Sequence, residues 1–231
     1  MRAVACIPCA VNPICKGNSF TVATSIAVLE RADLLPAFAV GAGGWVPRAQ
    51  WVPSPHCDAR PVGQPISLVV IHAISLPPGV FGGPDVLRLF SHQLDATVRP
   101  EYETLQGLQV SAHFFIRRRG ELIQCVSCDQ RAWHAGVSQW RGRSQCNAWS
   151  LGIELEGTDR VPFTLEQYQT LEALLRGLAQ RYPLREVVGH EHIAPGRKTD
   201  PGPCFQWGFL LRRFPEWHFP CLSLEGCPKG L

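Results

Sequence analysis

The sequence predicts an α/β fold: a single domain with a central mixed β-sheet flanked by helices. Three observations carry this prediction. The run SLVVIHAI, residues 67–74, is rich in β-branched residues and typical of a central strand buried on both faces. A hairpin pattern follows in residues 111–126, and a long amphipathic helix in residues 163–182. Strands interleaved with helices, with one hairpin among them, favour a mixed sheet covered by helices.

The predicted domain begins after an extension without periodicity. Residues 1–45 show no sustained period of 2 or 3.6, so we expect a poorly ordered N-terminal extension there. The domain itself is expected over residues 46–215, and residues 216–231 form a C-terminal tail.

Each element has its own signal. After the strand at 67–74, the Pro- and Gly-rich residues 75–85 predict a long loop, and residues 85–94 a short amphipathic helix. The hairpin at 111–126 is expected to turn at Arg119 and Gly120. Residues 150–157, SLGIELEG, read as another strand.

The helix at 163–182 carries the clearest signals. Thr164 can cap it in a capping box with Gln167, and Pro183 stops it. One apolar stripe predicts the face that packs on the sheet: Tyr168, Leu171, Leu175, Leu178 and Tyr182.

Composition limits the classes of partner. The 231 residues are 45% hydrophobic and 18% charged, which suits a globular domain, and 22 basic against 19 acidic side chains give a net charge of +3 spread along the chain. We therefore expect no nucleic-acid partner. No apolar run approaches the ~20 residues of a membrane span, and the first residues make a poor signal peptide. A cytoplasmic monomer that does not bind membranes is the expectation.

Cysteines offer an alternative kind of metal site. Cys6 and Cys9, and likewise Cys125 and Cys128, have the inner spacing of a zinc knuckle. Four ligands at matched spacings would be needed for a structural zinc, and the ten cysteines do not supply that pattern.

Histidines and an aspartate suggest a catalytic metal instead. His72 ends the buried strand, where binding groups of α/β proteins gather, although a lone histidine there is more often a core residue. In GHEHIAPGRKTDPG, residues 189–202, His190 and His192 would face the same side of an extended backbone, and Lys198 and Asp200 follow. A polar turn is the simpler interpretation of this segment alone. Two histidines plus an aspartate would nevertheless meet the three-ligand requirement of catalytic zinc.

Two glutamates lie on one face of the strand at 150–157. Glu154 and Glu156 are separated by roughly 6.6 Å of rise. An exposed acidic strand face is one interpretation; a glycosidase carboxylate pair is disfavoured, because such neighbours do not flank a sugar ring from opposite sides. With the histidines and the lysine, the pattern favours metal-assisted hydrolysis, in which a glutamate takes a proton from water and a lysine stabilises the oxyanion.

Six ordered blocks, spread from about Gly44 to Trp207, resemble a known family. The blocks are VPSPHCDARP, VVIHAISLPPGVFGGP, VSAHFFIRRRGELIQ, RAWHAGVSQWRGRSQCN, SLGIELEGTD and GHEHIAPGRKTDPGP. Through them the sequence is similar to the zinc-dependent N-acetylmuramoyl-L-alanine amidases (amidase type 2), related to peptidoglycan recognition proteins, and within them to the 1,6-anhydro-N-acetylmuramyl-L-alanine amidases.

The resemblance implies an activity and a ligand set. It implies hydrolysis of the amide between the lactyl group of 1,6-anhydro-N-acetylmuramic acid and L-alanine in anhydro-muramyl peptides during peptidoglycan recycling, in the cytoplasm. It places one Zn²⁺ per chain, in a surface groove at the strand ends, on His72, His190 and Asp200. It makes Glu154 the general base and Lys198 the residue that stabilises the transition state, while His192 and Glu156 become supporting residues.

Substrate contacts are expected in and beside the block at 131–147. Aromatic rings suit a sugar face and an arginine suits a peptide carboxylate, although each tryptophan could equally serve packing. The candidates are Trp133, His134, Trp140, Arg143, Asn147 and His113.

Three departures from the family pattern concern recognition rather than hydrolysis. Ala73 stands where the family usually has asparagine, and Gln109 and Gln145 replace two arginines expected near the peptide end. Two alternatives stay open: a non-catalytic peptidoglycan-binding module, which the complete ligand set disfavours, and an envelope amidase acting on intact peptidoglycan, which the poor signal peptide disfavours.

Overall fold

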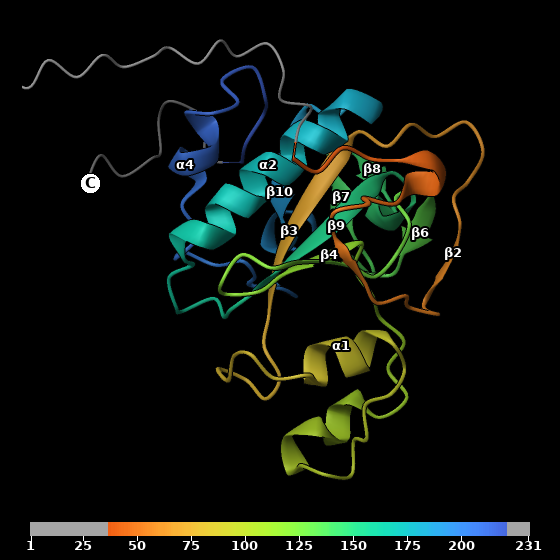
Figure 1. The fold of residues 1–231 in the computed structure, drawn as a ribbon, viewed down its shortest axis with the longest axis vertical. Coiled ribbons are helices and arrows are strands. Elements are labelled where there is room, and N and C mark those ends of the chain that lie inside the picture. The colour runs from red at the N-terminus through yellow and green to blue at the C-terminus, as the bar shows by residue number, and fades with distance from the viewer. Residues whose placement is uncertain (1–36, 221–231) are drawn as a thin grey trace, which may run out of the picture. The chain divides into compact units, whose positions relative to one another are not determined.

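A six-stranded sheet forms the centre of the computed structural model, which describes residues 37–220 (Figure 1). Its order is β1-β5-β4-β9-β3-β10. The strands are β1 (Gln50–Trp51), β3 (Leu68–Ile74), β4 (Phe114–Ile116), β5 (Leu122–Gln124), β9 (Ser150–Glu156) and β10 (Glu186–Gly189). Neighbouring strands are parallel except β4 and β5, which form the antiparallel hairpin. The predicted mixed sheet is therefore confirmed.

Short elements surround this sheet. Two small antiparallel pairs join β2 (Cys57–Ala59) to β6 (Gln130–Ala132) and β7 (Gln139–Trp140) to β8 (Arg143–Ser144). The helices are α1 (Asp85–Phe90), α2 (Leu165–Arg181), α3 (His190–Ile193) and α4 (Trp207–Leu211), with 3₁₀ turns at Ala42–Gly44, Pro100–Leu105 and Cys146–Ala148.

Helix α2 covers one face of the sheet, with α4 beside it (Figure 1). Its predicted start is confirmed: Gln167 N donates to Thr164 Oγ1 (3.2 Å) and Thr164 N donates to Gln167 Oε1 (3.1 Å). The predicted apolar stripe is buried along its whole length, and it packs against alternate residues of the strands, including Val69 and Ile71. Burying one such leucine or isoleucine contributes roughly 2 kcal/mol.

The opposite face of the sheet carries the polar residues of interest. Because side chains alternate along a strand, the neighbours of Val69 and Ile71 in β3, including His72, face away from α2. His72 is the register partner of Glu154 in the parallel strand β9. Paired residues of adjacent strands share a face, so His72 and Glu154 lie side by side there.

One predicted element, the helix after the first loop, needs adjustment. The hairpin forms as expected, with Gly120 at φ 83° closing its turn. The helix predicted at 85–94 ends at Phe90, because the Ser91 hydroxyl bonds back to Leu87 O (2.8 Å) and His92 adopts φ 60°. A left-handed residue ends an α-helix.

Packed residues lie on both sides of the expected domain, residues 46–215. Phe38 and Val40 pack against the core, and Gly44 O accepts from Gln124 Nε2 (2.9 Å), so the packed region starts before residue 46. At the other end Trp217 and Phe219 are buried, beyond the expected limit of 215. The rest of the expected extension and tail, residues 1–36 and 221–231, lies outside the described residues.

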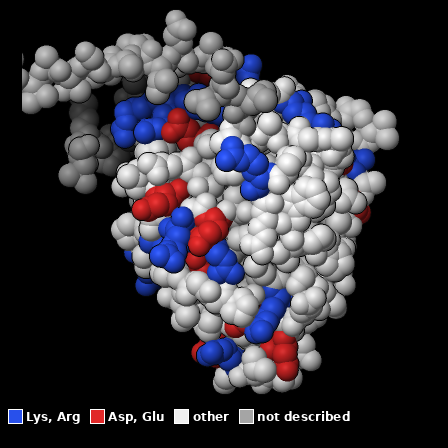
Figure 2. Space-filling model, in the orientation of Figure 1, with Lys and Arg blue, Asp and Glu red and all other residues white. Residues whose placement is uncertain are grey.

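The described surface mixes charges of both signs. Figure 2 shows Lys and Arg side chains interspersed with Asp and Glu on the face in view. Among the helices of residues 37–220, none is long and apolar enough to cross a membrane.

Candidate metal centre

Three adjacent parallel strands bring the candidate ligands together. His72 lies in β3, between β9 and β10 in the sheet. Glu154 lies beside it in β9, and His190 directly follows Gly189, the β10 residue that pairs with Ile71. Carboxyl ends of parallel strands meet at one edge of a sheet, so this topology places both histidines and Glu154 at the same edge.

The loop at 194–200 returns Asp200 to this edge. Glu191 N donates to Asp200 O (2.9 Å), and Arg197 Nη2 donates to the carbonyl oxygens of Ala135 and Val137, each at 2.7 Å. These bonds connect the loop to α3 and to the segment at 133–138, and so fix the position of Asp200.

His72, His190 and Asp200 form a triangle of ligand atoms. The two Nδ1 atoms are 3.0 Å apart, and each lies 3.2 Å from Asp200 Oδ2. A tetrahedral zinc with bonds of roughly 2.0–2.2 Å has ligand atoms about 3.3–3.6 Å apart. Among residues 37–220 this is the group of His, Cys, Asp and Glu side chains arranged to hold a metal ion, and its atoms lie within 4.8 Å of one another.

The protonation of these groups suits a cation. His190 Nε2 faces Ala135 O at 3.2 Å, and since a carbonyl only accepts, Nε2 carries the hydrogen and Nδ1 carries the lone pair. Burial lowers the pKa of His72 to about 4, against the opposing effect of Asp200, so this ring is neutral at neutral pH. Burial opposes ionisation of Asp200, but the proximity of His190 and His72 outweighs it and lowers the pKa of that carboxyl. Metal ligands must be deprotonated in this way.

Glu154 stands next to the triangle without joining it. Its Oε1 lies 4.0 Å from His72 Nδ1, and its buried Oε2 has no hydrogen-bond partner among the described residues. Burial, reinforced by the charge of Asp200 and opposed by Lys198, raises the pKa of this carboxyl well above its usual range. A carboxylate with a raised pKa and a free oxygen can take up a proton at neutral pH.

The site opens into a groove with an apolar wall. A cavity of about 270 Å³ is lined by the triangle, Glu154 and Lys198 on one side, and on the other by apolar side chains that include Leu89, Phe90, Leu105, Leu108 and Val110. A second cavity of about 400 Å³ shares Ala73, Lys198 and Asp200 with the first. Ala73, one of the departures from the family pattern, therefore lines both cavities.

Two sequence-based expectations about neighbouring residues are wrong. His190 and His192 do not face the same side, because α3 begins at His190 and residues two apart on a helix point about 200° apart. His192 Nδ1 instead accepts from Gly189 N (3.0 Å). Glu156 is buried rather than on an exposed acidic face, and it accepts from the backbone N–H groups of Gly82 (2.6 Å) and Arg118 (3.0 Å).

Three of the substrate candidates lie close under the site. His134 lines the groove and is buried against His72, and burial lowers the pKa of its ring well below the usual range. Asn147 Oδ1 accepts from the backbone N–H groups of His134 (3.1 Å) and Ala135 (2.8 Å). His113 is fully buried, and its Nδ1 accepts from Gly152 N (3.0 Å). The side chains of Asn147 and His113 thus bind backbone N–H groups of neighbouring segments.

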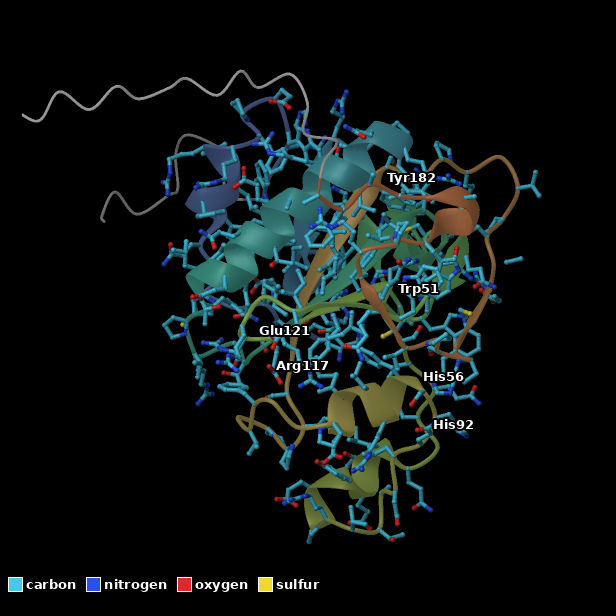
Figure 3. The ribbon with its side chains drawn as sticks, viewed as in Figure 1. Trp51, His56, His92, Arg117, Glu121 and Tyr182 are labelled. Atoms are coloured by element: carbon cyan, nitrogen blue, oxygen red, sulfur yellow. The ribbon has the colours of Figure 1, made fainter. Side chains whose placement is uncertain are left out.

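The other three candidates are not among the residues that line this groove. Trp140 and Arg143 line a separate cavity of about 240 Å³, where Trp140 Nε1 donates to Glu186 (2.5 Å). Trp133 stacks on His56, with ring centroids 6.1 Å apart. Figure 3 shows His56 and His92 near each other beside α1, and His56 Nε2 lies 3.1 Å from His92 Nδ1.

Sequence reasoning missed residues that act through tertiary contacts. Arg197 lies in the quoted GRK segment, but its role depends on carbonyls some sixty residues earlier. Leu105 and Leu108 have no sequence signal that would assign them to the groove wall. Ser150 opens a strand and was not distinguished from its apolar neighbours, although its hydroxyl lies 3.2 Å from His134 Nε2.

Comparison with known proteins agrees with this geometry. The model of the N-acetylmuramoyl-L-alanine amidase family matches residues 62–203. The 1,6-anhydro-N-acetylmuramyl-L-alanine amidase AmpD of Citrobacter freundii is 52% identical over 166 residues, which cover 71% of this chain and 89% of that protein. AmpD of Escherichia coli is also 52% identical, with 71% and 91% covered.

A solved structure shares the fold. The crystal structure of an AmpD derivative superposes with a TM-score of 0.72 at 50% identity, covering 74% of this chain and 97% of that one. The family match covers more than half of the chain, and every strand of the sheet except β1, together with the groove and the ligand triangle, lies within it. The chain therefore belongs to the N-acetylmuramoyl-L-alanine amidase family.

Proposed function

We propose that this protein is a zinc-dependent amidase that hydrolyses the amide between the lactyl group of 1,6-anhydro-N-acetylmuramic acid and L-alanine in muropeptides. The observation that carries the proposal is the triangle of two imidazole nitrogens and one carboxylate oxygen, 3.0–3.2 Å apart, beside a buried glutamate oxygen without a partner. The choice of substrate is supported by the relatives named 1,6-anhydro-N-acetylmuramyl-L-alanine amidase, which are 52% identical to this chain.

Each residue has a role that follows from its position. His72, His190 and Asp200 would hold one zinc ion, which supplies Lewis acidity for activating water and polarising the scissile carbonyl. Glu154 takes the proton from the attacking water and passes it to the leaving amine, for which its free Oε2 and raised pKa suit it. Lys198, which lines the groove, balances the negative charge that develops on the carbonyl oxygen.

Cleavage assays by mass spectrometry test this proposal. The protein is incubated with 1,6-anhydro-N-acetylmuramyl tripeptide and, separately, with intact peptidoglycan, each with and without a chelator. We expect release of free tripeptide from the small fragment only, abolished by the chelator and restored by zinc. Cleavage of intact peptidoglycan would identify an envelope amidase, and binding without cleavage would identify a recognition module.

Location, oligomeric state and substrate contacts remain predictions. Cell fractionation tests the expected cytoplasmic location, and sedimentation tests the expected monomer. Trp133, Trp140 and Arg143 lie outside the groove lining, so we expect alanine substitutions there to change KM less than substitution of Leu108, which lines it.

A further inference from the structure

We infer that His134 is a positioning residue that fixes the protonation and orientation of His72, rather than a contact for the substrate. The inference rests on the proposed metal site. It concerns the side of His72 that faces away from the ligand triangle, where His134 Nδ1 lies 3.0 Å from His72 Nε2. The two rings meet edge to face, with centroids 5.0 Å apart and planes at 85°.

A chain of hydrogen bonds determines which nitrogen carries each hydrogen. The Ser150 hydroxyl donates to Cys146 O (2.6 Å), because a carbonyl can only accept. Ser150 Oγ therefore accepts from His134 Nε2, 3.2 Å away. In a neutral ring only one nitrogen carries hydrogen, so His134 Nδ1 is an acceptor and His72 Nε2 donates to it.

This hydrogen-bond chain determines which nitrogen of His72 can bind the metal. With hydrogen fixed on Nε2, the lone pair of His72 is on Nδ1, the atom 3.0 Å from His190 Nδ1 and 3.2 Å from Asp200 Oδ2. For His190 the carbonyl of Ala135 does the same. Outer partners of this kind orient metal-binding histidines and raise their basicity.

Both ring nitrogens of His134 are thus engaged by the protein. Nδ1 faces His72, Nε2 faces Ser150, and the residue is 8% exposed. No ring nitrogen is left to bind a sugar hydroxyl or a peptide group, so the ring of His134 supports the metal ligand His72 and does not bind substrate.

Gly152 provides a second, independent observation. A Cβ atom added to Gly152 would lie 2.4 Å from His134 Cγ and 2.7 Å from its Nδ1. The φ of Gly152 is not in the left-handed region, so the obstacle to alanine there is steric, and the nearest atoms that its Cβ would meet belong to the imidazole of His134. At Gly152, strand β9 has no side chain where the ring of His134 lies against it.

A matched pair of variants tests the acceptor at position 134. Leucine and asparagine have the same branching, but only the asparagine oxygen can accept from His72 Nε2. We expect His134→Leu to weaken zinc binding by about 10–100-fold. His134→Asn should retain much of the affinity. Zinc affinity is measured on metal-free protein by competition with a chromophoric chelator, and thermal unfolding of each apoprotein shows that the chain is folded.

A double-mutant cycle tests the contact with β9. Gly152→Ala should lower zinc affinity in the wild-type chain but have little effect in a His134→Ala background, where the added methyl meets no ring. Gly208→Ala is the control, because its Cβ would meet only the end of the flexible Arg212 side chain at 3.4 Å.

The outcomes separate this inference from the proposed function. A wild-type chain that binds no zinc refutes the proposed function. Tight zinc binding by the wild type, with His134→Leu folded and within twofold of it, overturns the inference alone. Equal losses for His134→Leu and His134→Asn, or additive effects of Gly152→Ala and His134→Ala, would also overturn it, because the effect would then be one of packing.

Discussion

Replacement of Glu154 by glutamine isolates the proton-transfer step. Glutamine has nearly the shape of glutamate, and Oε2 has no hydrogen-bond partner among the described residues, so the substitution breaks no bond in the resting protein. It removes the ability to take a proton from water. General acid–base catalysis contributes typically 10²–10⁴-fold to rate, about 2.7–5.5 kcal/mol. We expect a loss of rate in the upper part of this range, because no second base among the described residues can replace Glu154. Asp200 is the neighbouring carboxylate, near enough to affect the pKa of Glu154, but its Oδ2 faces both histidines of the metal site.

The metal should stay in this variant. Glu154 Oε1 lies 4.0 Å from His72 Nδ1. This distance is longer than those within the ligand triangle, so we do not expect Glu154 to be a zinc ligand. The assay is kcat for cleavage of 1,6-anhydro-N-acetylmuramyl tripeptide, together with zinc content by elemental analysis. A kcat within tenfold of wild type at full zinc occupancy would refute the assignment of Glu154 as the base.

The same variant should change the stability of the apoprotein. Because burial raises the folded-state pKa of Glu154, the stability contributed by its protonated form is complete below the unfolded pKa of about 4.3 and is lost as the pH rises through the folded pKa. Metal-free Glu154→Gln should therefore melt at a higher temperature than metal-free wild type at neutral pH, with the difference shrinking towards pH 4. An equal difference at both pH values would contradict this explanation.

Four further changes test other parts of the structure. Asp200→Ala should leave less than one zinc per chain by elemental analysis, because the triangle loses its anionic corner. Lys198→Met should lower kcat by about 10²–10³-fold with zinc content unchanged, since Lys198 lines the groove but is not a ligand. Leu171→Ala should lower the free energy of unfolding in urea by about 2–5 kcal/mol, because this side chain of α2 is fully buried in the core against the sheet. Deletion of residues 1–45 should lower the melting temperature below that of a chain lacking only 1–36; equal values would show that the packing of residues 37–45 adds nothing.

Local sequence signals predicted those parts of the fold that depend on local chemistry. The β-branched run at 67–74 forms a central strand because its apolar side chains, such as Val69 and Ile71, are buried against α2. Thr164 and Gln167 form the predicted capping box because both partners lie within one helical turn. Residues 37–45 carry no such local signal, because they are held partly through backbone bonds, such as that from Gln124 to Gly44 O, which leave no hydrophobic period.

The site could be predicted only in part. Residue types and the resemblance singled out His72, His190 and Asp200, and the structure brings them together. Spacing alone misjudged His192, because the chain turns into a helix at the residue where an extended strand was assumed. The contact between His134, Ser150 and Gly152 follows from strand register and a missing Cβ, which no local pattern encodes.

A zinc titration of the metal-free protein tests the central claim most directly. Cleavage of 1,6-anhydro-N-acetylmuramyl tripeptide is followed as zinc is added in fractions of an equivalent. If the triangle of His72, His190 and Asp200 is the catalytic metal site, activity is absent at the start, rises linearly and stops at one zinc per chain. Cleavage by the metal-free protein, or activity that continues to rise beyond one equivalent, would contradict that account.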